Sequence, residues 1–108
     1  MEQVDKQQLT TIAMQVILYA GNARESIFKA IDKASTGSFE SANELVKRAE
    51  EEVATAHREQ TSTLQKEAEG IEIPYSPLFV HAQDTLMTVK SEINIIKELI
   101  KLYRTMGV

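Results

Sequence analysis

The positions of proline and glycine constrain this chain more than any other feature. Its only prolines, Pro74 and Pro77, stand close together. Proline interrupts helices, and glycine favours turns and helix ends. With Gly37 and Gly70, the proline pair divides the chain into three parts, none of which shows the alternating pattern of a β-strand. The sequence therefore predicts an all-α protein built from three long helices.

The first two parts carry apolar residues at helical spacing. From about Asp5 to Ser35, apolar residues recur at steps of three and four, which predicts one amphipathic helix. A second helix is expected to begin after Ser38 as its N-cap and to end at Gly70 as a C-terminal cap. Short connections between three helices favour an up-down-up antiparallel bundle.

The third segment, residues 78–106, has two apolar faces. Ser76 followed by Pro77 predicts its start, with an N-cap and a proline at the first helical position. The face expected to fill the bundle core contains Leu78, Ala82, Leu86, Val89, Ile93, Ile96, Ile100 and Tyr103. A second face, called the outer strip here, contains Asp84, Thr88, Ser91, Ile95, Leu99, Leu102 and Met106. A three-helix bundle does not need the outer strip for its own core, so the economical interpretation is self-association along it as a short coiled coil.

Self-association of this kind would gather Asp84 from several chains at a symmetry axis. Carboxylates that meet there repel one another and are costly to bury unpaired. Their oxygens suit magnesium or another oxygen-preferring divalent ion. The alternative is a monomeric bundle in which Asp84 is solvated, and the pattern alone leaves both interpretations open.

His81 falls at the edge of the outer strip, in the second turn of the third helix. An isolated histidine is most often an ordinary exposed or partly packed residue. The alternative is a phosphoryl acceptor, because a helix N-terminus favours added negative charge. His57 is the only other histidine, and no His-x-x-x-His spacing is present, which argues against a histidine zinc site.

Composition excludes several classes of function. A length of 108 residues suits a single domain over 1–108, and a net charge of −4 argues against nucleic-acid binding. The absence of cysteine excludes disulfides and cysteine-ligated zinc. The N-terminus lacks a signal-peptide pattern, and polar residues within the uncharged stretch 7–23 argue against a membrane span. We therefore expect a cytoplasmic protein.

A set of short motifs is spread over nearly the whole chain. They are YAGNAR at 19–24, AHREQT at 56–61, KEAEG at 66–70, YS at 75–76, VHAQD at 80–84 with LMT at 86–88, and ELIKLY at 98–103. In combination and in order, they resemble the lactose/cellobiose-type IIA components of the bacterial phosphoenolpyruvate-dependent sugar phosphotransferase system. Within that family, VHAQD and LMT resemble the phosphorylation site.

The resemblance implies a three-helix antiparallel subunit assembled as a homotrimer through the C-terminal helix. It implies a phosphotransferase subunit in which His81 receives a phosphoryl group from HPr and passes it to a cysteine of the IIB component. It also implies one Mg²⁺ per trimer, held on the axis by Asp84 of each subunit. Contact with the membrane would be indirect, through the transporter component. The sugar is not specified, because a IIA component passes on phosphate and need not touch sugar.

Four further side chains are candidates for the surroundings of the phosphoryl group. Gln83 and Thr85 flank His81 and could donate hydrogen bonds, while His57 and Gln60 could line the same cleft.

Three positions depart from the pattern of the family. Thr85 stands where histidine or an aromatic residue is common, Pro77 replaces a more usual aliphatic residue, and Glu25 stands where serine is frequent.

Two rival functions also remain. One is a non-catalytic helical adaptor whose second apolar face binds a partner helix. The other is a metal-dependent oligomeric regulatory domain in which His81 and Asp84 are ligands.

Overall fold

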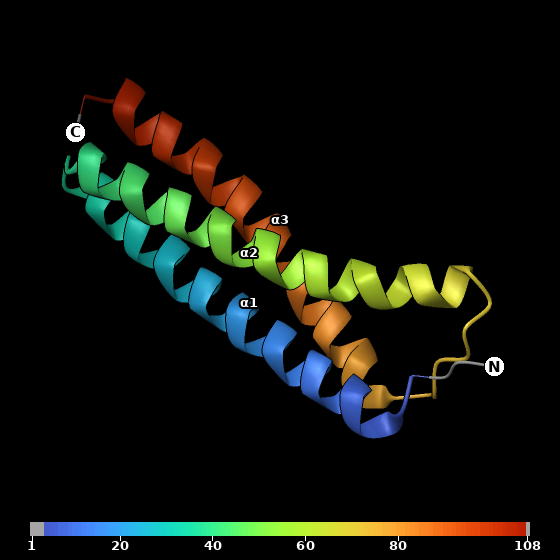
Figure 1. Cartoon of the computed structure of the whole chain (residues 1–108). Coiled ribbons are helices and arrows are strands. Elements are labelled where there is room, and N and C mark those ends of the chain that lie inside the picture. Colours follow the sequence, from blue (N-terminus) through green and yellow to red (C-terminus); the bar gives the residue numbers. More distant parts are fainter. Residues whose placement is uncertain (1–3, 108) are drawn as a thin grey trace.

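Three long helices make up most of the protein. The computed structural model describes residues 4–107. It contains α1 (Lys6–Ser35), α2 (Phe39–Ala68) and α3 (Pro77–Thr105), which are shown in Figure 1. The prediction of an all-α protein with three helices is confirmed.

Side chains close the N-terminal ends of two of the helices. At the start of α1, the Gln8 N–H donates to Asp5 Oδ1 at 2.7 Å, and the Asp5 N–H donates to Gln8 Oε1 at 3.2 Å. At the start of α3, the Phe79 N–H donates to the Ser76 hydroxyl oxygen at 3.0 Å. Ser38 stands at the N-cap of α2 as expected, but its side chain makes no capping hydrogen bond. The predicted N-cap position is therefore confirmed, but Ser38 occupies it without a side-chain hydrogen bond.

Glycines in the left-handed conformation end α1 and α2. Gly70 has a φ of 95°, and the Ile71 N–H beyond it donates to the Lys66 carbonyl at 3.0 Å. This is the hydrogen-bond pattern by which glycine commonly stops a helix. The last helical residue is Ala68, so Gly70 lies just past the helix end. Gly37, with a φ of 83°, ends α1 in the same way.

The helices form an elongated bundle that opens at one end. The principal extents are 59 × 20 × 19 Å. Figure 1 shows the α1–α2 turn and the C-terminus at one end, and the α2–α3 connection at the other. α1 packs extensively against both other helices, whereas α2 and α3 contact each other much less. The C-terminal half of α2 diverges from the first turns of α3, and the connection closes this gap (Figure 1).

The core is rich in small residues. Its largest fully buried side chains are Leu9, Val16, Ile27, Leu86 and Val89, and alanines fill much of the space between them. On α3, the predicted core face is buried from Ala82 to Ile100, while Leu78 and Tyr103 at its ends are only partly buried. Phe79, which the predicted face omitted, is 6% exposed and takes the core position in the first turn.

The two serine caps provide a matched test of these helix starts. Ser76→Ala removes the acceptor for the Phe79 N–H and should lower the free energy of unfolding by about 1 kcal/mol. Ser38→Ala removes a hydroxyl that makes no capping bond, so its effect should stay within about 0.5 kcal/mol. Urea unfolding followed by circular dichroism, at equal protein concentrations, measures both. Equal losses in the two variants would contradict this account of the caps.

Candidate functional site

His81 lies on the surface of a rigidly held helix start. It is the fifth residue of α3, and its side chain is exposed. Phe79 and Ala82 on either side of it are buried in the core, and the Ser76 cap fixes the first turn. The backbone that carries the histidine is therefore well anchored, while its ring is open to solvent. An added negative group here would lie close to the positive end of the α3 dipole.

The two candidates that flank His81 point away from it or are already engaged. The Thr85 hydroxyl donates to the His81 backbone carbonyl at 2.8 Å. A hydroxyl carries a single hydrogen, so Thr85 in this arrangement cannot also donate to a phosphoryl group. Gln83 is half-buried and lies about 200° around the helix from His81. In the part of the chain that the structure describes, no hydrogen bond reaches the His81 ring.

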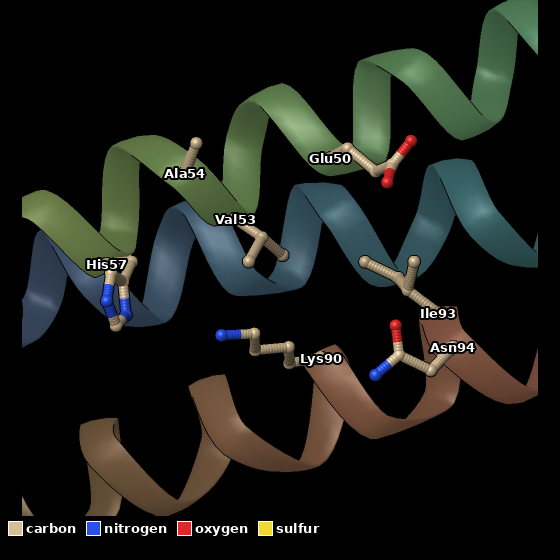
Figure 2. Close-up of a pocket in the computed structure, with 7 residues that line it drawn as sticks. All are labelled: Glu50, Val53, Ala54, His57, Lys90, Ile93 and Asn94. Atoms are coloured by element: carbon tan, nitrogen blue, oxygen red, sulfur yellow. The ribbon is translucent and has the colours of Figure 1, made fainter.

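His57 lines a different pocket from His81. A pocket of about 240 Å³ lies between α2 and α3. It is lined by the seven residues drawn in Figure 2, which are Glu50, Val53, Ala54, His57, Lys90, Ile93 and Asn94. Lys90 is nine residues beyond His81, so it lies about 13 Å further along α3 and half a turn around it. Gln60 is only 6% exposed and belongs to the interior of the bundle. Among the described pockets, none brings His57 or Gln60 together with His81.

The outer strip is exposed along α3. Ile95, Leu102 and Met106 are 61%, 56% and 65% exposed, and Leu99 is 39% exposed. Asp84 at the start of the strip is also exposed and makes no hydrogen bond or ion pair with the described residues. Over residues 4–107, no group of three His, Cys, Asp or Glu side chains could hold a metal ion. Within the described residues, a single chain therefore supplies only one carboxylate, that of Asp84, to a metal site on the outer strip.

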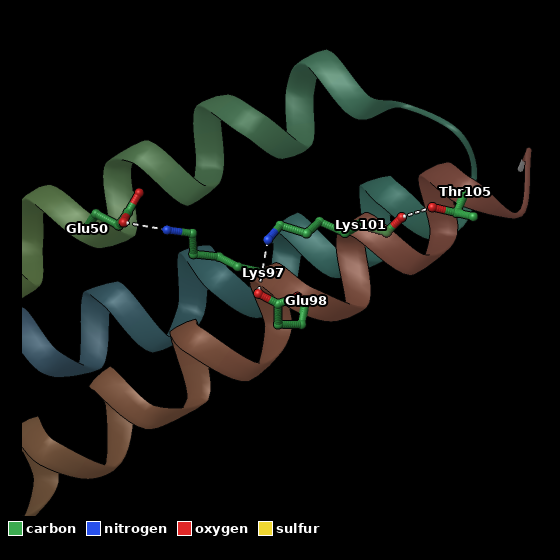
Figure 3. Close-up of polar contacts among 5 residues, drawn as sticks. All are labelled: Glu50, Lys97, Glu98, Lys101 and Thr105. Atoms are coloured by element: carbon green, nitrogen blue, oxygen red, sulfur yellow. Dashed lines mark hydrogen bonds and ion pairs between the residues drawn. The ribbon is translucent and has the colours of Figure 1, made fainter.

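Ion pairs cluster towards the other end of the bundle. Lys97 Nζ lies 3.1 Å from Glu50 Oε2 and links α3 to α2, and Lys101 pairs with Glu98 on α3 at 3.1 Å (Figure 3). Arg24 of the YAGNAR motif pairs with Glu92 across α1 and α3 at 2.8 Å. Glu25, one of the departures from the family, pairs with Lys29 at 3.0 Å. The more exposed of these pairs, Lys29–Glu25 and Lys101–Glu98, add little stability individually.

A groove near His81 was missed by the sequence analysis. It measures about 310 Å³ and lies where α2 and α3 diverge. We call it the fork groove. Its lining consists of Thr63, Leu64, Glu67, Ile73, Pro74, Tyr75, Ser76, Phe79, Val80 and Gln83. The aromatic residue Tyr75 beside Pro74 is the one sequence signal that could have pointed to the groove. The divergence of the two helices is a tertiary feature that the sequence pattern does not contain.

Comparison with known proteins decides the family. The profile of the family described as "PTS system, Lactose/Cellobiose specific IIA subunit" matches residues 11–104. This chain belongs to that family. The lactose-specific EIIA component of Lactococcus lactis subsp. lactis is 38% identical over 101 residues, which cover 94% of this chain and 96% of the relative.

Solved structures of IIA proteins share the fold. The cellobiose-specific enzyme IIA from Bacillus anthracis superposes with a TM-score of 0.88 at 33% identity, covering 97% of this chain and 94% of that one. The IIA(Chitobiose) chain of a complex with HPr, from Escherichia coli, has a TM-score of 0.81 at 31% identity, covering 93% and 97%. The names of these relatives specify lactose, cellobiose and chitobiose, so membership of the family does not by itself select a sugar.

Within the described residues, no helix is both long enough and apolar enough to cross a bilayer. Family membership makes this IIA protein a component of sugar uptake with a general phosphotransferase role.

Proposed function

We propose that this IIA protein carries a phosphoryl group on His81, accepting it from HPr and passing it to a cysteine of the IIB component. One observation carries the proposal: the histidine of the VHAQD motif is exposed in the second turn of a capped helix. The complex of the related IIA(Chitobiose) with HPr supports HPr as the donor. On this proposal the protein works in the cytoplasm and meets the membrane only through the transporter component.

The chemistry requires little from the protein beyond placement of the ring. In the first step a ring nitrogen of His81, Nε2 by resemblance to the family, attacks phosphorus while the bond to HPr breaks. In the second step the IIB sulfur attacks phosphorus, and the His81 ring is the leaving group. Alignment and neutralisation of charge dominate phosphoryl transfer. An open ring on a fixed backbone suits this, because two partners must reach the same nitrogen in turn.

We further propose that this chain is an antiparallel bundle and that three copies of it assemble as a homotrimer through α3. The outer strip supplies the contact, since Ile95, Leu99 and Leu102 are exposed apolar residues on one face of the helix. Asp84 lies on the same face, so three carboxylates would meet near the axis. Carboxylate oxygens are suitable ligands for Mg²⁺. Such an ion would be held by Asp84 of each copy, and it would supply positive charge that offsets their repulsion.

The carrier role is tested at the two histidines. His81→Gln should abolish phosphorylation by HPr, phosphoenolpyruvate and the general phosphotransferase enzyme, because the nucleophilic nitrogen is lost. His57→Gln is the matched control and should keep acid-labile phosphate at the wild-type level, since His57 lines a different pocket. Phosphorylation is measured with radiolabelled phosphoenolpyruvate, and circular dichroism checks the helices. Phosphate that persists in His81→Gln, or that disappears in His57→Gln, would contradict the assignment. No labelling of the wild type would favour a helical adaptor instead.

The axial site is tested through the assembly. A chelator should weaken the wild-type trimer by about tenfold in dissociation constant for each 1.4 kcal/mol of repulsion that the ion offsets, and Mg²⁺ should restore it. Asp84→Leu removes the repulsion and extends the apolar strip, so its trimer should be insensitive to both. Asp32→Leu changes an exposed acid on α1 and should behave like the wild type. Sedimentation velocity measures all three proteins. A wild-type protein that is monomeric throughout, or a trimer indifferent to Mg²⁺, would exclude the axial site.

A further inference from the structure

A polar pocket lies on the seam between α1 and α2. It measures about 210 Å³, and residues within 22–29 of α1 and 45–52 of α2 line it. We call it the seam pocket. Leu45 is the only apolar residue among the seven that line it. A ligand for such a pocket has to be small and polar, because it must replace the hydrogen bonds that water makes there.

Two side chains of the seam pocket are withdrawn from solvent and lack hydrogen-bond partners. Ser26 is only 9% exposed, and its hydroxyl makes no hydrogen bond with the described residues. Glu52 is half-buried, and its Oε2 is shielded from solvent without a hydrogen-bond partner. A buried polar group without a partner costs free energy, and a charged group costs more. A glutamate carboxylate turns easily about its terminal bond, so either oxygen can face the pocket.

The charges around the seam pocket leave one cation and one anion unpaired. Lys29 and Glu25 pair with each other at 3.0 Å. Within residues 4–107, neither Arg48 nor Glu52 takes part in an ion pair. These two residues stand one helical turn apart on α2, so they share a face of the helix. Direct pairing between such side chains is weak, so a ligand that offers each of them a charged partner competes with it.

We propose that the seam pocket binds a free α-amino acid. The ligand's ammonium donates to the Glu52 carboxylate and to the Ser26 hydroxyl oxygen. Its carboxylate accepts two hydrogen bonds from the Arg48 guanidinium, whose planar fork suits that group. Each unpaired group of the pocket then has a partner, and the ligand's own two charges are both neutralised.

The seam pocket is separate from the surface that the carrier role uses. None of its lining residues belongs to α3, which holds His81 and the outer strip. Arg24, close to the pocket in sequence, pairs with Glu92, which lies eleven residues, or about 16 Å, beyond His81 along α3. Amino-acid binding therefore does not depend on phosphoryl transfer at His81, and either can be refuted without the other.

Matched ligands test the pocket on the unmodified full-length protein. Backbone amide signals are followed by nitrogen–proton correlation NMR while L-alanine is added at constant ionic strength. The shifts should saturate with a dissociation constant on the order of 1 to 10 mM, and they should cluster in residues 22–29 and 45–52. Propionate lacks the ammonium and ethylamine lacks the carboxylate, so each should bind at least about tenfold more weakly.

Two variants and a control assign the charges. Glu52→Gln removes the anion and Arg48→Gln removes the cation, and each should weaken L-alanine binding by about tenfold or more. Glu51→Gln makes the same change at the next residue, which is exposed and does not line the pocket, so it should keep the wild-type affinity. Glutamine forms helices about as well as either residue, and circular dichroism checks that the helices are intact.

Saturable binding of L-alanine that both charge-removing variants lose, with helicity unchanged, supports the amino-acid site. The proposal is overturned if no saturable shifts appear, which would leave a recess filled by solvent. It is also overturned if propionate or ethylamine binds as well as L-alanine, because the pocket would then recognise a single charge. An effect of Glu51→Gln equal to that of Glu52→Gln would overturn it as well, since the loss would then follow net charge alone.

Discussion

The packing of Phe79 and Ala82 in the core fixes how α3 is turned, and the hydrogen bond from the Phe79 N–H to the Ser76 hydroxyl closes its first turn. Each residue advances a helix by about 100°, so the direction of every later side chain follows from these buried positions. Pro77 strengthens the same start, because its ring favours the first helical turn and cannot be accommodated further inside a helix. With Phe79 and Ala82 in the core, His81 faces solvent and the outer strip stays outside.

The buried residues of α2 change in size and polarity towards the His81 end of the bundle. Ala42, Ala49 and Ala56 are fully buried and recur at seven-residue steps, which allows the neighbouring backbone to approach closely. The next position in this series is Thr63, and Gln60 is buried beside it. Larger and more polar side chains replace alanine in this part of α2, where α2 and α3 diverge (Figure 1). The fork groove is the space that this divergence leaves, and the proline-containing connection forms its wall.

Much of the fold could be predicted because its signals are local. Pro77, Gly37 and Gly70 act through their own backbone conformations, and the core face of α3 follows from periodicity alone. The site was predicted less completely. His81 and Asp84 were placed by helical winding, and their exposure agrees with that placement. The hydrogen bond from the Thr85 hydroxyl to the His81 carbonyl could not be predicted from the sequence. Threonine in a helix can either donate to the backbone or point outward.

The other candidates depended on how two helices lie against each other. His57 and Gln60 are three residues apart on α2, which suggests one face, yet Gln60 is buried and His57 is exposed in the pocket beside Lys90. Whether such a pair reaches His81 depends on the crossing of α2 and α3, and no single-helix pattern contains that information. The same limitation applies to the fork groove.

The openness of His81 has a physical consequence for a carrier. A site that enclosed the phosphoryl group with several donors would bind it tightly and slow its departure, since stabilising the loaded state raises the barrier to onward transfer. Within the described residues His81 receives no hydrogen bond to its ring, and Thr85 already donates to the backbone. On the proposed function, a phosphorylated His81 would be stabilised mainly by the α3 N-terminus and by solvent. Selectivity would then come from the surface around the ring, which adjoins His81 without enclosing it. A carrier that must release the phosphoryl group gains more from recognising its protein partners than from binding that group tightly.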